Sequence, residues 1–367
     1  MKYDYDLLVI GSGSAGFSAA EAARGTGRKI GIIEGDKLGG DCPNYACVPT
    51  KALLRSVKAF LELKSLKALG IAFDAMPTLS FEAVMKRRKM IVETLGGSRM
   101  TKIADKLGID IISGFATFTD PHTVHVSGKE FTAARFVIAT GTKTRVPQIP
   151  GLSDVSWISH REAIAFDECP SSMIVIGAGT VGCELSLFYA VMGTEVTLLQ
   201  AASRILSREE PEISAVATEG LVGVGVNVMT SAEVVRAEKQ DGGVRITARV
   251  GKTMQTVDAR VLMLASGRTS NTGGLGCKAA GVKLDAYGTI ETDIEMRTSQ
   301  KHIWAAGDVD GGMQFTHTAH YEGRVAGHNA FSRKPLQRDE RVVPRVTFVH
   351  PEVASVGMTE EEAKKAF

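Results

Sequence analysis

Residues 6–16 read DLLVIGSGSAG, and this stretch decides the fold. The apolar run predicts a buried strand, the glycines predict a tight turn, and the alanine-rich residues that follow, through Arg24, predict a helix. In such a unit Gly11 and Gly13 let the backbone approach a pyrophosphate, and Gly16 lets the helix pack on the strand. Because the helix N-terminus then faces the phosphates, the stretch predicts a dinucleotide site.

An acidic residue after the next strand strengthens this prediction, because the glycine motif alone is not specific. Residues 29–33 read as a strand that ends in Glu34, eighteen residues after Gly16. A carboxylate at this position can accept a hydrogen bond from an adenosine ribose hydroxyl. We therefore prefer this role to the alternative of a surface acid that follows a strand.

The same pattern occurs a second time later in the chain. A strand over 173–176, the glycine turn GAGTVG over 177–182, a helix through Val191 and a strand over 195–199 follow one another. This order again predicts a strand, a phosphate-binding turn and a helix. The sequence therefore predicts two dinucleotide sites.

The ribose position of the second site holds Gln200, not an acid. The carboxylate that would repel a 2′-phosphate is missing, and Arg204 and Arg208 lie just beyond. NADPH is therefore allowed and mildly favoured over NADH. The alternative, in which both arginines are solvated loop charges, stays open, and so does the choice of nucleotide.

Two cysteines follow the first nucleotide unit in residues 38–51, LGGDCPNYACVPTK. The four residues between Cys42 and Cys47 put the two sulfurs on different faces of an ideal helix, so a bridge needs a distorted first turn. Such a bridge is strained and reducible. Closing so small a loop removes only roughly 2 kcal/mol of unfolded-state entropy, so stability is a poor reason for the pair. A metal site is not predicted, because a second pair of soft ligands is missing.

These motifs, taken in order, resemble those of the pyridine nucleotide-disulfide oxidoreductases of the glutathione reductase, dihydrolipoyl dehydrogenase and mercuric reductase group. The signature of that family is a glycine pair, two cysteines separated by four residues and a Pro-Ser/Thr-Lys tail. The resemblance extends to Ala139-Thr-Gly141, to Gly267-Arg268 and to residues 298–308, which end IWAAGD. It covers essentially all 367 residues.

The resemblance implies an α/β fold class with two Rossmann-like dinucleotide-binding domains, one for FAD and one for NAD(P). The NAD(P) domain is inserted in the FAD domain, and the start of an α+β interface domain follows. The implied domains are residues 1–150 and 271–340 for FAD, 151–270 for NAD(P), and 341–367 for the beginning of a truncated dimerisation domain. In the family, the rest of that domain supplies a His-Glu pair from the partner subunit. We expect most of it to be absent here, and His350-Pro-Glu352 to be structural.

The resemblance also implies an order of electron transfer. Hydride passes from the nicotinamide to FAD, and the reduced flavin opens the Cys42–Cys47 bridge at Cys47, which leaves Cys42 as the interchange thiolate. A helix N-terminus after Cys42 and the nearby cation Lys51 are physical means of lowering the thiol pKa. Lys51 is also implied to contact the flavin near its reactive nitrogen and to pair with Glu184. From the residues alone, Glu184 reads as a first-turn helix acid and Lys51 as an exposed charge. The predicted catalytic residues are Cys42, Cys47, Lys51 and Glu184.

The predicted cofactor contacts fall at the glycine turns, at the strand ends that follow them and in the segments of the resemblance. Asp308 is assigned by position to the ribityl or phosphate region of FAD, and residues 314–317 are assigned to a path along the flavin. The predicted cofactor-binding residues are Gly11, Gly13, Ser14, Ala15, Gly16, Glu34, Gly40, Asp41, Lys51, Ala116, Thr140, Gly141, Gly177, Gly179, Thr180, Val181, Gly182, Gln200, Arg204, Gly267, Arg268, Asp308, Gln314, Phe315 and Thr316.

The cysteine segment departs from the family pattern at several positions. Asp41 and Ala46 stand where the family usually has Thr and Gly, and Pro43 and Tyr45 are also less usual. We therefore expect the reactivity of the cysteines to be tuned differently here. The three remaining cysteines are expected to serve packing or loops and carry no predicted chemistry: Cys169, Cys183 and Cys277.

The leading function is a flavoprotein NAD(P)H:disulfide oxidoreductase that passes electrons to the cysteine pair and on to a small-molecule disulfide, dithiol or metal-ion substrate. The alternatives are an NAD(P)H diaphorase or oxidase that does not need the cysteines, and a non-enzymatic redox sensor. The net charge of +2 and the lack of a basic block argue against a nucleic-acid partner. The N-terminal residues lack a signal-peptide pattern and no apolar run approaches membrane-spanning length, so we predict a cytoplasmic protein without a membrane partner, and a homodimer in the full-length form.

Overall fold

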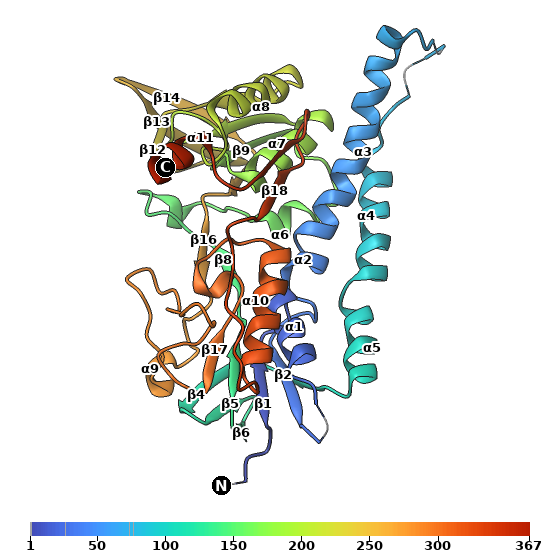
Figure 1. The fold of residues 1–367 in the computed structure, drawn as a ribbon. Coiled ribbons are helices and arrows are strands. Elements are labelled where there is room, and N and C mark those ends of the chain that lie inside the picture. Colours follow the sequence, from blue (N-terminus) through green and yellow to red (C-terminus); the bar gives the residue numbers. More distant parts are fainter. Residues whose placement is uncertain (1, 26, 73, 76) are drawn as a thin grey trace. The chain divides into compact units, whose positions relative to one another are not determined.

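The computed structural model describes residues 2–25, 27–72, 74–75 and 77–367 (Figure 1). They form two compact units, each assembled from three separate stretches of the chain. Unit 1 comprises Met1–Asn44, Val92–Lys143 and Arg268–Glu340, and unit 2 comprises Tyr45–Ile91, Thr144–Gly267 and Arg341–Phe367. Most of unit 2 is therefore inserted between two stretches of unit 1.

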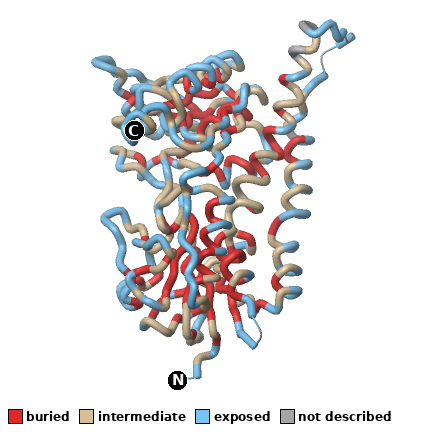
Figure 2. Tube along the Cα trace, in the orientation of Figure 1, coloured by how far each residue is buried: buried red, intermediate tan, exposed pale blue. Residues whose placement is uncertain are grey.

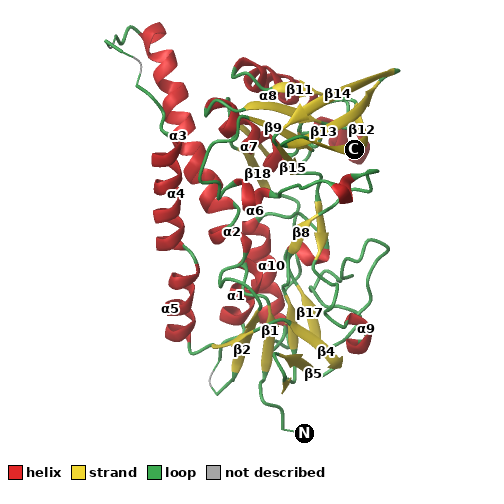
Figure 3. Cartoon of the chain, turned by 180° about the vertical axis from the view of Figure 1, so that it is seen from behind, coloured by secondary structure: helices red, strands yellow, loops and turns green. Residues whose placement is uncertain are grey.

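Unit 1 is built on a parallel sheet of five strands (Figures 1 and 3). Its order is β17-β7-β1-β2-β3. Successive side chains of β1 point to opposite faces, so that Leu7 and Val9 belong to one apolar core and Leu8 and Ile10 to another. Both faces of the sheet are covered, and its strands β1, β7 and β17 are therefore buried and apolar throughout, whereas the edge strand β3 has exposed polar residues at both ends. The strands are β1 (Leu7–Ile10), β2 (Ile30–Glu34), β3 (Asp110–Ser113), β7 (Phe136–Ile138) and β17 (Ile303–Ala305).

Helices cover one face of this sheet, and a small antiparallel sheet covers the other. The helical face holds α1 (Ser14–Ala22), α5 (Gly97–Leu107) and α10 (Thr316–Asn329). The opposite face holds β4 (Ala116–Asp120), β5 (Thr123–Val126), β6 (Lys129–Thr132) and α9 (Cys277–Ala280). Figure 2 shows the parallel strands in the colour of buried residues.

Unit 2 repeats this plan with other residues. Its parallel sheet has the order β11-β10-β9-β15, with one face under helices and the other under the antiparallel sheet β12-β13-β14. The parallel strands are β9 (Ser172–Ile176), β10 (Glu195–Leu199), β11 (Asn227–Met229) and β15 (Val261–Leu264). The antiparallel strands are β12 (Ala232–Gln240), β13 (Gly243–Val250) and β14 (Thr253–Ala259). The helices are α3 (Cys47–Ser65), α4 (Phe81–Leu95), whose last residues from Val92 belong to unit 1, α7 (Thr180–Val191) and α8 (Pro211–Gly223).

The remaining elements are short. Two strands pair as β8 (Thr142–Thr144) with β16 (Arg268–Ser270), and β18 (Pro344–Thr347) forms a hairpin with β19 (Val353–Val356). Next to that hairpin, Glu352 forms an ion pair with Lys58 over 2.8 Å. The short helices are α2 (Asp41–Asn44), α6 (His160–Ala163), α11 (Glu360–Ala366), η1 (Leu66–Leu69), η2 (Leu152–Asp154) and η3 (Asp308–Asp310).

The two parallel sheets confirm the predicted α/β class with Rossmann-like units. Element boundaries differ from the predicted ones by one or two residues, which is the usual uncertainty of helix ends. For example, α1 ends at Ala22 and not at Arg24. Among the residues that the structure describes, we find no helix long and apolar enough to cross a membrane.

Helices α1 and α10 approach so closely that glycine is required at the contact. A Cβ atom on Gly323 would overlap the carbonyl oxygen of Ala15, and one on Gly327 would overlap the carbonyl oxygen of Ala19. The two glycines are four residues apart and therefore lie on one face of α10. This contact places the N-terminal turn of α1 against the middle of α10 within unit 1.

We expect Gly323→Ala to destabilise the chain by about 1–3 kcal/mol, because the added methyl group meets backbone that cannot move aside without separating the helices. Gly223→Ala is the matched control, since its Cβ would find open space at the end of α8. That control should be neutral or stabilising by at most about 1 kcal/mol. Urea unfolding measures both, and equal midpoints for the two variants would contradict this account of the contact.

Candidate functional site: two nucleotide turns and a cysteine segment

The first glycine turn has the geometry that a phosphate loop needs. Gly11 has φ +100°, and a Cβ there would collide with the carbonyl of Ala139. A Cβ on Gly16 would overlap the carbonyl oxygen of Gly11, so this glycine is what lets α1 pack on β1. A Cβ on Gly13 would have nothing within 4 Å, so the backbone borders open space where α1 begins. A dinucleotide pyrophosphate fits this turn.

Glu34 is anchored at the end of β2 by the same turn. Its Oε2 accepts hydrogen bonds from the Ser12 amide over 2.9 Å and from the Ser12 hydroxyl over 2.5 Å. Its Oε1 accepts from the Asp36 amide over 2.8 Å. A carboxylate has about four acceptor positions, so a ribose hydroxyl can still bind. Contact with a ribose stays a prediction.

An ionic cluster within unit 1 joins three predicted residues that are distant in sequence. The Arg268 guanidinium reaches Asp308 through Nη1 over 2.5 Å and Asp41 through Nη2 over 3.1 Å. The Thr142 hydroxyl donates to the same Asp308 oxygen, Oδ2, over 3.1 Å. All three charged side chains are at most about a quarter exposed, so their attraction is less screened than at an open surface. Arg268 therefore orients Asp308 at the carboxyl end of the sheet.

For some of the other predicted FAD contacts of unit 1 the structure shows a close neighbour or a buried polar group, and for the rest it shows only their place. Gly40 lies against the first turn, because its Cβ would be 2.8 Å from the Cα of Gly13. The Thr140 hydroxyl is buried without a hydrogen-bond partner, which suits a polar ligand atom. Ser14 donates to the carbonyl of Thr316 over 2.9 Å. For the following residues the structure gives only their place, and contact with FAD stays a prediction: Ala15 at the start of α1, Ala116 in the β4 core, Gly141 before β8, and Gln314 and Phe315 before α10.

The second glycine turn, in unit 2, repeats the geometry of the first. Gly177 has φ +107°, and its Cβ would collide with the carbonyl of Ala265. A Cβ on Gly182 would overlap the carbonyl oxygen of Gly177, and one on Gly179 would have nothing within 4 Å. Helix α7 begins directly after it, with Thr180 and Val181 in its first turn. A second dinucleotide fits here.

The residues that would select the second nucleotide are held by their own loop. Gln200 accepts from the Ala178 amide and donates to the Arg204 carbonyl, both over 3.4 Å. The Arg204 guanidinium donates to the carbonyls of Ser207 and Glu209 over 3.0 and 3.2 Å. Its Nη2 is therefore engaged in capping a turn, whereas Arg208 is exposed.

The helix is interrupted between the two cysteines. Cys42 lies in α2 of unit 1, Cys47 is the first residue of α3 in unit 2, and both are half-buried. Ala46, between the helices, has φ −125° and ψ −91°, a sparsely populated conformation. The Arg161 guanidinium lies 4.1 Å from the centre of the Tyr45 ring, a cation–π contact. A helix N-terminus was expected after Cys42. The structure places Cys42 within the short α2, and the long helix α3 begins at Cys47, after the distortion at 45–46.

Lys51 and Glu184 form the ion pair that the resemblance implied. The Lys51 ammonium lies 2.8 and 3.0 Å from the two Glu184 oxygens. The Glu184 side chain is 2% exposed and also accepts from the Phe348 amide over 3.0 Å. The Lys51 ammonium lies 5.0 Å from the centre of the Phe348 ring. Glu184 is therefore a buried acceptor in α7, not a first-turn acid or a surface charge.

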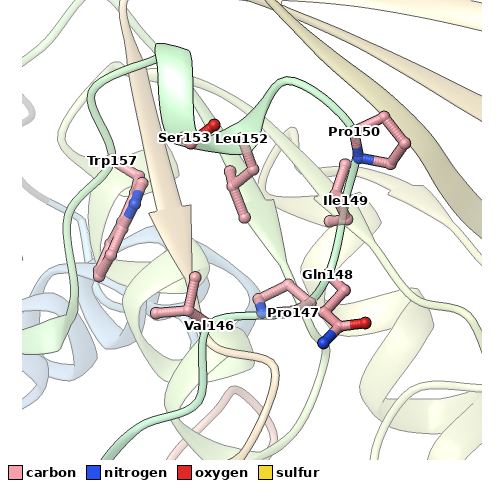
Figure 4. Close-up of a pocket in the computed structure, with 8 residues that line it drawn as sticks. All are labelled: Val146, Pro147, Gln148, Ile149, Pro150, Leu152, Ser153 and Trp157. Carbon is pink, nitrogen blue, oxygen red and sulfur yellow. The ribbon is translucent and has the colours of Figure 1, made fainter.

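One pocket of unit 2 lies outside the predicted residues. It encloses about 410 Å³ and is formed by a single segment of the chain, as Figure 4 shows. Its lining is mostly apolar: Val146, Pro147, Gln148, Ile149, Pro150, Leu152, Ser153 and Trp157. The predicted Gly267 is not among them, and its carbonyl accepts from the Arg145 amide over 3.0 Å. In the described part of the chain we find no group of three or more His, Cys, Asp or Glu residues that could hold a metal ion.

Residues 5–323 match the family described as pyridine nucleotide-disulphide oxidoreductase, and residues 343–367 match its dimerisation domain. The chain belongs to this family. It is 36% identical over 366 residues to mercuric reductase of Staphylococcus aureus, covering 99% of this chain and 66% of that protein. It is 35% identical to mercuric reductase of Bacillus cereus, covering 99% of this chain and 58% of that protein. The chain thus spans less than two thirds of these relatives.

Other members of the family are similar over more of their length. Dihydrolipoyl dehydrogenase of Geobacillus stearothermophilus is 35% identical, with 98% of this chain and 76% of that protein covered. The solved HOCl-induced flavoprotein disulfide reductase RclA of Escherichia coli, as a Cu(II) complex, has a TM-score of 0.87 at 28% identity, with 100% of this chain and 80% of that chain covered. Members of this family are enzymes that act on sulfur groups and use FAD and NAD(P)H, which confirms the predicted enzyme class and cofactors at the level of the family.

Three contacts of these sites were missed by reasoning from the sequence. Thr142 supports Asp308, Phe348 supports Glu184, and Arg161 covers Tyr45. Thr142 directly follows the Ala139-Thr-Gly141 motif, which could have drawn attention to it. Phe348 and Arg161 carry no local signal, because each meets its partner from a distant part of the chain.

We expect Glu184→Ala to destabilise the chain by about 1–3 kcal/mol, because it leaves the Phe348 amide without its acceptor, while the Lys51 ammonium, whose side chain is 34% exposed, can turn to water. Lys51→Met combined with Glu184→Gln should cost less, since the amide oxygen can still accept from Phe348 and no charge is left unpaired. Chemical denaturation of the parent, the single variant and the double variant measures this order. A double variant less stable than the single one would show that the pair is not the main stabilising contact.

Proposed function

We propose that this chain is an NAD(P)H:disulfide oxidoreductase that passes electrons from NAD(P)H through FAD to the Cys42–Cys47 pair. The observation that carries the proposal is the presence of two glycine turns of the same geometry, one in each unit, with a cysteine pair in the segment that leads from unit 1 to unit 2. When bound, FAD and NAD(P)H would supply the hydride chemistry. The chain would supply the turns, the cysteines and the charges around them.

Unit 1 would hold FAD, and unit 2 would hold NAD(P)H. The amides of the turn at Gly11–Gly16 would bind the FAD pyrophosphate, Glu34 its ribose, and Asp308 its ribityl or phosphate region. The amides of the turn at Gly177–Gly182 would bind the pyrophosphate of NAD(P)H. The division into residues 1–150, 151–270, 271–340 and 341–367 remains a prediction.

Cys42 and Cys47 would form the redox-active bridge. Two electrons and one proton convert such a bridge into one thiolate and one thiol. Cys47 begins the 19-residue helix α3, whose N-terminal amides stabilise a thiolate at that sulfur. Cys42 would then be the thiol that, on losing its proton, exchanges with the substrate. Glu184 would fix the Lys51 ammonium so that its charge stays at one place beside the flavin.

The substrate would be a small-molecule disulfide, dithiol or metal ion. Similarity to mercuric reductases and to dihydrolipoyl dehydrogenases supports this range without narrowing it. The match of residues 343–367 to the dimerisation domain supports a homodimer in the full-length form. A cytoplasmic location remains a prediction.

An anaerobic titration of the purified, FAD-loaded chain with NADPH, and separately with NADH, tests the proposal. We expect two-electron reduction to produce two titratable thiols and the long-wavelength absorption of a thiolate beside oxidised flavin. Cys47→Ser should lose that absorption, and both Cys42→Ser and Cys47→Ser should lose disulfide reduction. Cys169→Ser is the matched control, because Cys169 is also half-buried but forms a hydrogen bond with Thr194 over 3.2 Å, beyond the end of α7 that lies opposite the second turn.

Other outcomes have defined meanings. If the flavin bleaches identically in the parent and in both cysteine variants, the cysteines are not coupled to it and the chain is a diaphorase. If the parent binds no FAD, the proposal fails.

A further inference from the structure

Three acidic side chains gather around a single arginine in unit 1. The Arg338 guanidinium lies 3.0 Å from Asp310, 3.5 Å from Glu322 and 3.8 Å from Glu340. The side chains of Asp310 and Glu322 are 1% and 2% exposed. One oxygen of Glu340 is buried without a hydrogen-bond partner. Three carboxylates near one guanidinium leave an excess of negative charge, which is costly where water is excluded.

This cluster holds both ends of the turn that carries Asp308. Glu322, on α10, accepts a hydrogen bond from the Gly307 amide over 2.7 Å. At the other end of the turn, Asp310 accepts from Arg338 over 3.0 Å and from the Thr292 hydroxyl over 3.3 Å. Gly307 has φ +78°, a conformation that glycine adopts without strain, and its amide is directed at Glu322.

A proton bound by the carboxyl groups of this cluster removes the excess negative charge. Burial, reinforced by the charge of Asp310, raises the pKa of Glu322 to about 9. Burial also raises the pKa of Asp310, to about 6, against the opposing effects of the Gly312 amide and Arg338. The charged groups that face Glu322 come from η3 and from residues 338–340, while α1 packs here through the backbone of Ala15. At neutral pH the cluster therefore holds a proton.

We propose that Glu322 is a positioning residue for FAD: with the cluster protonated it fixes the Gly307–Asp310 turn and so aims Asp308 at the cofactor, and loss of the proton at alkaline pH releases the turn. This inference rests on the proposed function, because it takes Asp308 as an FAD contact. Glu322 itself need not touch FAD. It acts through the Gly307 amide.

The direction of the pH effect follows from the raised pKa of Glu322. A carboxyl whose pKa rises from 4.5 to about 9 in the folded chain contributes stability that is fully present below 4.5. That contribution is lost as the pH rises through the folded-state value of about 9. Once Glu322 is ionised, it repels Asp310 and Glu340, and the turn loosens. FAD affinity should therefore fall between pH 7 and pH 10.

The test is the FAD dissociation constant, measured by flavin fluorescence from pH 7 to pH 10 on the parent chain and three variants. For the parent we expect at least about tenfold weaker binding at the alkaline end, which corresponds to one unit of pKa difference between the FAD-bound and apo chains. Glu322→Gln keeps the acceptor for Gly307 and mimics the neutral carboxyl, so its affinity should stay constant. Glu322→Ala should bind FAD weakly at every pH. Glu291→Gln, at an exposed acid of unit 1, should behave as the parent.

Hydrogen exchange of the Gly307 amide gives a readout that does not depend on activity. It should be slow in the parent and in Glu322→Gln at pH 7 and fast in Glu322→Ala. The inference is overturned if Glu322→Gln loses affinity with pH as the parent does, or if Glu322→Ala leaves both the affinity and the exchange unchanged. These results would leave the proposed function standing. A parent that binds no FAD at any pH would instead sink the proposed function and this inference together.

Discussion

The contact of each helix with the turn that precedes it is the constraint on which the rest of the structure depends. Gly16 lies so close to the Gly11 carbonyl that any side chain would overlap it, and Gly182 lies equally close to Gly177. Only this approach places the first amides of α1 and α7 at the carboxyl ends of their sheets. The direction of those amides then decides where an anion can bind. Both of the proposed nucleotide sites therefore depend on glycine at these two positions.

The same constraint continues into α10 within unit 1. Because α1 is tied to its turn, the close contact at Gly323 and Gly327 fixes α10 relative to that turn. Helix α10 in turn carries Glu322, which supports the Gly307 amide beside Asp308. Backbone contacts and one buried carboxyl thus connect the first glycine turn with a residue almost three hundred positions later. The packing of unit 1 and the placement of its charged groups therefore depend on each other.

What could be predicted from the sequence depends on whether the signal is local. The strands and both glycine turns follow from residue patterns a few positions long, and the Lys51–Glu184 pair followed from a family resemblance. The support of Glu184 by Phe348 and of Gly307 by Glu322 could not be predicted, because each contact joins distant segments that have no motif of their own. A distorted first turn was expected for a bridge between the cysteines, but neither the break at Tyr45–Ala46 nor the start of α3 at Cys47 was predicted.

The two turns are alike, so the preference for one nucleotide over another must come from the residues at the strand ends. Glu34 accepts two hydrogen bonds from Ser12 of the first turn and one from Asp36, so its carboxylate lies next to that turn, where it would repel a 2′-phosphate. Gln200 takes the corresponding place in the second turn without a charge. Arg204 already donates to two carbonyls, so it could bind a 2′-phosphate only by giving up those hydrogen bonds. Arg208 is exposed and is therefore the cation more available to a phosphate. If unit 2 binds NADPH, as we propose, the absence of repulsion at Gln200 would account for it, without a dedicated phosphate site.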